Sequence, residues 1–135
     1  MKFLIDTHLL LWAASDELPQ KAVPYFTNDE NELYFSSASI WEIVIKNGLN
    51  RPDFNVDPVV LYKGLLDNGY KELPVNSRHT FPVAGLPPIH KDPFDRILIA
   101  QAKTEGMTLL TSDKNVSLYC RSAAGLADSP VVYVE

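Results

Sequence analysis

Short apolar runs alternate along this chain with longer segments whose apolar residues recur at helical spacing. The first run, Lys2–Asp6, is apolar without alternation, which is typical of a strand buried on both faces of a parallel sheet. The predicted strands are Lys2–Asp6, Leu33–Ser36, Tyr70–Leu73, Met107–Leu110 and Val131–Val134.

The segments between these strands predict helices. Pro93–Glu105 has the clearest pattern, with an apolar stripe and Gly106 directly after its last turn. One helix is predicted from Thr7 to an interruption at Asp16–Pro19. The other predicted helices are Gln20–Asn28, Ala38–Gly48, Pro58–Asp67 and one or two turns within Asn76–Val83. In Ala38–Gly48 the residues expected to face the core are Ile40, Trp41, Val44 and Ile45. Trp12 and Trp41 are interpreted as core residues.

Strands that alternate with helices indicate right-handed crossovers. The predicted fold is therefore an α/β domain of three layers, α/β/α, with a central, mostly parallel sheet that includes all residues 1–135. In such sheets ligands bind beyond the carboxyl ends of the strands. The residue that follows each strand is consequently the first place to look for chemistry.

Composition narrows the class of protein. The chain has 135 residues, 46% apolar and 21% charged, and its longest apolar run, Leu9–Ala14, is too short to span a membrane. Without a signal-peptide pattern we expect a cytoplasmic protein that does not associate with membranes. Cys120 is the only cysteine, which excludes an internal disulfide and a cysteine-based zinc site. The net charge of −5 argues against nucleic-acid binding through many basic residues, although metal ions can supply local positive charge.

Two acidic residues lie at the predicted carboxyl ends of the first two strands. Asp6 follows Phe3-Leu4-Ile5 directly, where it suits equally a site or an N-cap of the helix from Thr7. Glu42 lies in Ser39-Ile40-Trp41-Glu42, which fits a capping box, but the same helix also opens at the sheet edge.

Two more acidic residues in the second half of the chain are expected at the same edge of the sheet. Pro93 suits the first position of its helix, so Asp92 is assigned as the N-cap and Asp95 as the site residue. Asp113 follows the strand Met107–Leu110 through Thr111 and Ser112, and is either a polar turn residue or a site acid. Thr111 and Ser112 are expected to position that carboxylate or a metal-bound water, and they are also candidates for contact with the substrate.

Four carboxylates at one sheet edge would repel one another and raise their own pKa values unless a cation neutralised them. Oxygen ligands without clustered histidine or cysteine favour Mg²⁺ or Mn²⁺ over zinc. Such a site can activate water for an in-line displacement at phosphorus. The residues therefore predict a site at Asp6, Glu42, Asp95 and Asp113 that hydrolyses phosphodiester bonds.

These segments also resemble the PIN-domain nucleases, and within them the VapC-type toxins of toxin–antitoxin pairs. The matching segments are Phe3-Leu4-Ile5-Asp6-Thr7-His8, Ser37-Ala38-Ser39-Ile40-Trp41-Glu42-Ile43 with Lys46, His90-Lys91-Asp92-Pro93-Phe94-Asp95-Arg96-Ile97-Leu98-Ile99-Ala100-Gln101-Ala102, and Leu110-Thr111-Ser112-Asp113. The resemblance spans nearly the whole chain and is weakest after Val116. It implies an endoribonuclease dependent on Mg²⁺ or Mn²⁺, with the four acids as its catalytic and metal-binding residues. It further implies a homodimer and inhibition by a cognate antitoxin protein.

Other residues have competing interpretations. Lys46 either contacts the RNA substrate or is a solvated lysine in the last turns of its helix, where the helix dipole favours it. Arg96 either binds a phosphate of the substrate or pairs with a carboxylate. His8, His79 and His90 lack the spacing of metal ligands, and His8 is the best candidate of the three for a direct role. Two rival functions follow: metal-independent RNA cleavage by a histidine pair, and a PIN-like scaffold that binds RNA or a partner without turnover.

Overall fold

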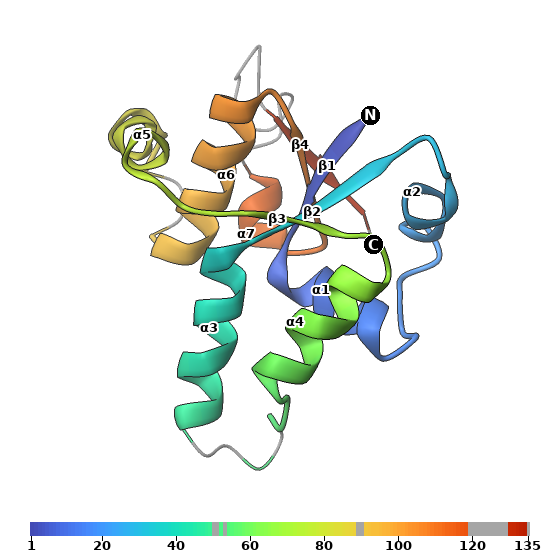
Figure 1. Ribbon diagram of the computed structural model, residues 1–135. Helices are drawn as coiled ribbons and strands as arrows, with labels where there is room; N and C mark the ends of the chain where they lie inside the picture. Colours follow the sequence, from blue (N-terminus) through green and yellow to red (C-terminus); the bar gives the residue numbers. More distant parts are fainter. Residues whose placement is uncertain (50–51, 53, 89–90, 119–129, 135) are drawn as a thin grey trace.

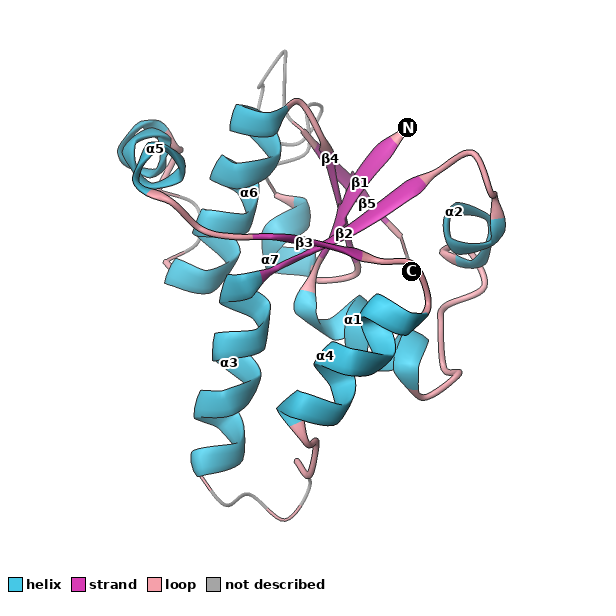
Figure 2. Ribbon diagram, in the orientation of Figure 1, coloured by secondary structure: helices cyan, strands magenta, loops and turns pink. Residues whose placement is uncertain are grey.

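Five strands form one sheet in the order β3-β2-β1-β4-β5, and all four pairings between neighbours are parallel (Figure 2). They are β1 (Lys2–Ile5), β2 (Glu32–Ser36), β3 (Lys71–Leu73), β4 (Thr108–Thr111) and β5 (Val131–Tyr133). This computed structural model describes residues 1–49, 52, 54–88, 91–118 and 130–134. The five predicted strands are confirmed, with ends shifted by a residue or so. The shift at the first strand matters, because β1 ends at Ile5 and leaves Asp6 just beyond it.

Helices cover both faces of the sheet (Figure 1). The helical segments are α1 (Thr7–Ala14), α2 (Val23–Thr27), α3 (Ser37–Gly48), α4 (Pro58–Asp67), α5 (Ser77–Thr80), the 3-10 helix η1 (Phe81–Gly85), α6 (Pro93–Glu105) and α7 (Lys114–Ser117). Side chains of β1 alternate between the layers: Phe3 and Ile5 pack in the core with α1, α2, α3 and α4, whereas Leu4 packs with α6 and α7. The predicted three-layer α/β/α architecture is therefore confirmed. Among the described residues, no helix is long and apolar enough to cross a membrane.

Aspartates begin most of the longer helices. Asp6, Asp57, Asp92 and Asp113 each accept hydrogen bonds from backbone N–H groups in the first turn of α1, α4, α6 and α7 respectively. The assignment of Asp92 as the N-cap is confirmed. At the other end of α6, Gly106 adopts a left-handed conformation with φ of 67°, which glycine tolerates without strain. The sequence thus sets both ends of the helix that carries Asp95.

The prediction for the start and the buried face of α3 was partly wrong. The helix is capped by Ser36, whose hydroxyl accepts the N–H of Ala38 at 3.0 Å, so Ser39 lies inside the helix and forms no capping box with Glu42. Trp41 was expected in the core but is 62% exposed, and Val44 and Ile45 are exposed too. Figure 1 shows why: α3 extends away from the sheet, so its later turns have no strand to pack against.

Two smaller helices also differ from expectation. The predicted helix Gln20–Asn28 is only Val23–Thr27, because Pro24 has no N–H and belongs in a first turn. The short helix α7 was not predicted; Asp113, interpreted as a turn residue or site acid, caps it.

Candidate active site

A small cavity of about 80 Å³ lies at the carboxyl edge of the sheet, where several strands and helices meet. Its lining residues are Asp6, Thr7, His8, Glu42, Lys46, Asp92, Asp95 and Asp113. All four predicted site acids are therefore brought to one place, although they are up to 107 positions apart in the chain (113 − 6). Asp6 and Thr7 follow β1 at the start of α1, Glu42 and Lys46 come from α3, and the remaining aspartates come from the starts of α6 and α7.

Asp6 is both a helix cap and a cavity residue, so the two interpretations of it are compatible. It is 3% exposed. One carboxylate oxygen, Oδ1, accepts the N–H of Leu9 at 3.0 Å, and the other accepts the hydroxyl of Thr111. Burial raises the pKa of this carboxyl, because the charged form loses water, and the hydrogen bond from Thr111 is the main opposing effect. The charge of His8 opposes it further.

Glu42 is held by two polar side chains, Thr7 and Lys46. Its Oε1 accepts the hydroxyl of Thr7 at 2.8 Å, and its Oε2 lies 3.0 Å from Nζ of Lys46 one turn later in α3. The hydroxyl of Ser39 lies 3.0 Å from that of Thr7, which makes a chain of polar contacts from Ser39 to the carboxylate. Glu42, Thr7 and Ser39 are all buried.

The two aspartates at the start of α6 have different contacts. Asp92 uses Oδ1 to accept the N–H groups of Phe94 and Asp95 at 2.9 and 3.3 Å. Asp95 lies in the first turn and lines the cavity. A carboxylate in that turn is stabilised by the helix dipole.

Asp113 completes the set from the other side of the cavity. Its Oδ1 accepts the N–H of Asn115 at 2.7 Å, and its own N–H donates to the hydroxyl of Thr111 at 3.0 Å. Thr111 is fully buried and does not line the cavity, and neither does Ser112. Thr111 therefore has hydrogen bonds that can hold the carboxylates in position, as predicted. Because its side chain does not line the cavity, it is not placed to contact a substrate there.

Of the two basic residues expected near substrate, only Lys46 lines the cavity. The guanidinium of Arg96 instead donates to the carbonyl oxygens of Val83 at 2.8 Å and Pro87 at 3.1 Å. Arg96 thus joins the start of α6 to the segment that precedes it.

Of the histidines, His8 lines the cavity and His79 does not. His8 is exposed at the cavity and lies against Trp12, with ring centroids 6.0 Å apart. His79 is fully buried elsewhere: Nδ1 accepts the N–H of Asn76, and Nε2 lies 2.7 Å from Glu105. Its role is therefore structural, and the predicted pairing of two histidines has no counterpart in the described residues. His90 lies outside the described residues.

Three lining or supporting residues were missed from the sequence. Thr7 follows Asp6, and Ser39 precedes Glu42 by three positions, the spacing of neighbours on one helical face. That spacing was the available signal for Ser39. Asp92 was assigned only to the helix cap, yet it also lines the cavity.

The donor set around the cavity suits a hard divalent cation, because five carboxylates supply oxygen ligands. In the part of the chain that the structure describes, however, no three acidic or histidine side chains are grouped closely enough to hold an ion as they stand. Their hydrogen bonds explain this: Asp6 and Asp113 accept from the protein backbone, and Glu42 is paired with Lys46. The carboxylates are suitable ligands for the metal, but their hydrogen-bond and ion-pair partners in this structure would compete with the metal for the same oxygens.

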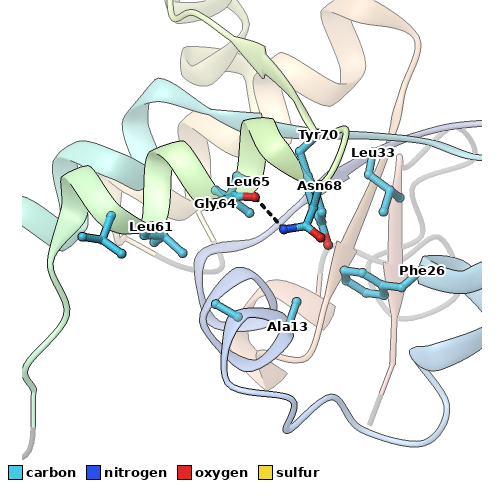
Figure 3. Close-up of a pocket in the computed structure, with 10 residues that line it drawn as sticks. Ala13, Phe26, Leu33, Leu61, Gly64, Leu65, Asn68 and Tyr70 are labelled. Carbon is cyan, nitrogen blue, oxygen red and sulfur yellow. Dashed lines mark hydrogen bonds between the residues drawn. The ribbon is translucent and has the colours of Figure 1, made fainter.

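Larger hollows contain none of the predicted acids. One of about 590 Å³ lies between α1, α2 and α4 (Figure 3), where Asn68 Nδ2 donates to the carbonyl of Gly64 at 2.7 Å. Burial raises the pKa of Tyr70 in its wall to about 12. Size alone would favour this hollow or another of about 600 Å³, but neither lining contains a carboxylate, histidine or lysine for hydrolysis. The small acidic cavity is the better candidate for chemistry.

Comparison with known proteins agrees with this architecture. The family model of the PIN domain matches residues 3–121, so the chain belongs to the PIN domain family. No curated protein matches.

Solved structures share the fold at low sequence identity. DNA-bound VapBC from Salmonella typhimurium has a TM-score of 0.61 and 16% identity, covering 100% of this chain and 97% of that chain. VapBC-1 from nontypeable Haemophilus influenzae has a TM-score of 0.60 and 16% identity, covering 92% and 94%. A domain of a functionally unknown Methanocaldococcus jannaschii protein has a TM-score of 0.64 and 17% identity, covering 99% and 91%.

Proposed function

We propose that the protein is an endoribonuclease that depends on Mg²⁺ or Mn²⁺ and acts as the toxin of a toxin–antitoxin pair. The observation that carries this proposal is the convergence of Asp6, Glu42, Asp95 and Asp113 on one cavity of a PIN domain chain. Four acids from separate parts of the sequence are costly to gather without a cation to neutralise them.

In the proposed reaction the four acids hold the ion, which supplies Lewis-acid activation of water and phosphate when bound. The chain contributes the remaining arrangement. Thr111 and Thr7 orient Asp6 and Glu42, so that these carboxylates need not reorganise during the reaction. Lys46 is the basic side chain at the cavity that can meet an RNA phosphate.

The test is cleavage of a labelled RNA by purified protein freed of any bound partner. We expect cleavage with Mg²⁺ or Mn²⁺, none with EDTA, and none with Asp6→Asn or Asp95→Asn. Asp57→Asn is the matched control, because Asp57 also caps a helix but does not line the cavity. Undiminished cleavage by Asp6→Asn would overturn the mechanism.

The same assay separates the two rival functions. Activity that survives EDTA and is lost in His8→Ala would indicate histidine chemistry. Tight RNA binding without cleavage, with every divalent metal tried, would indicate a scaffold. The buried hydrogen bonds of His79 argue against the first, and the complete acidic set argues against the second.

A homodimer and a cognate antitoxin protein in the cytoplasm belong to this proposal. They are supported by the resemblance to VapC-type toxins and by apolar side chains that the chain leaves exposed on α3 and α4. Those side chains are Trp41, Val44, Ile45, Leu49, Val59 and Val60. Light scattering should report a dimer, and growth arrest on induction should be relieved by a short gene adjacent to this one. Sequencing RNA 5′ ends after brief induction would identify the substrate.

A further inference from the structure

Oε1 of Glu42 has a fixed partner. The hydroxyl of Thr7 has one proton and lies 2.8 Å from Oε1 and 3.0 Å from the hydroxyl of Ser39. An ionised carboxylate can only accept, so Thr7 must donate to Glu42 and Ser39 must donate to Thr7. All three side chains are buried, which leaves this end of the carboxylate little freedom to exchange partners.

Oε2 of Glu42 has a replaceable partner. It lies 3.0 Å from Nζ of Lys46, whose side chain is 31% exposed, compared with 11% for Glu42. Because Glu42 is buried, removal of Lys46 alone would leave its charge uncompensated, so Lys46 leaves Oε2 only when another cation takes its place. Lys46 is partly exposed and can then turn towards water, and Thr7 would still hold the other oxygen.

The negative charge of the cavity lining makes Lys46 important for a second reason. Five carboxylates line the cavity, and Lys46 is the only lysine or arginine among its described lining residues. Its ammonium contacts Oε2 of Glu42, and both residues line the cavity together with the other acids. Lys46 and a divalent ion are thus expected to compete for the same oxygen of Glu42.

We propose that Lys46 is a built-in counterion, which neutralises Glu42 in the metal-free protein and is displaced from Oε2 when a divalent ion binds. The released ammonium then remains at the cavity and meets a phosphate of the RNA. This inference rests on the proposed function, and it adds a direct coupling between metal binding and substrate binding. It also accounts for the absence, among the described residues, of a ready-made group of ligands.

Calorimetric titration with Mn²⁺ alone tests the first half, without any need for activity. Removing a cation a few ångströms from the ion should tighten binding, so we expect Lys46→Gln to lower the Mn²⁺ dissociation constant by about fivefold. Lys46→Arg, which keeps the charge, should bind as the wild type does or more weakly. Lys71→Gln is the matched control: it removes the same charge from an exposed pair with Glu32, and should change nothing.

Cleavage of a short single-stranded RNA at saturating Mn²⁺ tests the second half. Lys46→Gln should raise KM, and the slope of log KM against log salt should fall by about 0.7, the value for one phosphate contact on a single strand. Tighter metal binding together with weaker substrate binding is the expected signature. A purely structural lysine would shift neither quantity in this way.

The outcomes separate this inference from the proposed function. If wild-type protein binds Mn²⁺ but Lys46→Gln binds it equally or more weakly, the counterion role is wrong and the nuclease proposal stands. If KM and its salt dependence are unchanged, the phosphate role is wrong. If the wild type binds no divalent ion at all, both proposals fail together.

Discussion

Thr111 donates a hydrogen bond through its hydroxyl to Oδ2 of Asp6, which joins two residues 105 positions apart in the sequence. The same hydroxyl accepts the N–H of Asp113 at 3.0 Å. Because the N–H occupies the oxygen as a donor, the hydroxyl proton is free to point at Asp6. One buried side chain therefore links the carboxylate after β1 to the segment that carries another site acid.

Replacing this hydroxyl with a methyl group should destabilise the protein. Thr111→Val removes the hydroxyl donor to Oδ2 of the buried Asp6 and leaves the N–H of Asp113 without this acceptor, so we expect a loss of about 2 kcal/mol in the free energy of unfolding. Urea denaturation followed by circular dichroism measures it. Thr108→Val, on the same strand, is the control and should cost little. Equal stability of Thr111→Val and the wild type would contradict the importance of this contact.

The negative charge of Asp6 should lower the free energy of unfolding of the metal-free protein at neutral pH. Burial raises its pKa in the folded protein above the unfolded value of 3.8. Below that value both states are protonated and there is no penalty; as pH rises towards the folded pKa, the unfolded state ionises first and folding becomes less favourable. We therefore expect metal-free Asp6→Asn, which keeps a good N-cap residue, to be more stable than the wild type at pH 7. The difference should shrink towards pH 3.8.

Urea denaturation across that pH range, with EDTA present, checks the sign. Asp57→Asn, at an exposed helix cap, is the control and should show no comparable gain. A variant Asp6→Asn that is less stable at every pH would mean that the charge of Asp6 stabilises the metal-free fold.

The sheet and the ends of its strands were predictable because they depend on short-range chemistry. Buried parallel strands need unbroken apolar runs, and aspartates begin helices, so Asp6 and Asp92 were placed correctly at the starts of their helices. Because parallel strands end at one edge, their convergence followed from topology alone.

Features that depend on tertiary contacts were not predictable in this way. Trp41 has the same apolar character as a core residue, but Ile43 in the same turn of α3 faces the core, which leaves Trp41 on the exposed face of the helix. Arg96 resembles a phosphate ligand in the sequence, but the carbonyl oxygens it contacts belong to a segment about ten positions earlier. The partnership of Thr7 with Glu42 likewise joins residues 35 positions apart.

Asp92 and Asp95 should separate stability from activity. Asp92→Ala removes the N-cap of α6 and should cost about 1 kcal/mol, whereas Asp92→Ser restores a cap and should restore stability. Asp95→Asn should abolish RNA cleavage and Mn²⁺ binding with little change in unfolding. If Asp92→Ser folds normally but cannot cleave RNA, Asp92 is a site acid as well as a cap.

Arg96 should act on stability rather than on RNA binding. Its guanidinium bridges the carbonyl oxygens of Val83 and Pro87, and an ammonium cannot reproduce this fork, so we expect Arg96→Lys to lose about 1–2 kcal/mol on urea denaturation. Arg96→Gln, which removes the charge, should leave the salt dependence of KM unchanged, in contrast to Lys46→Gln. Arg78→Gln, at an exposed ion pair with Glu105, is the control and should cost far less. A folded Arg96→Gln protein with a reduced salt slope would instead restore Arg96 as a phosphate ligand, because loss of a phosphate contact lowers that slope.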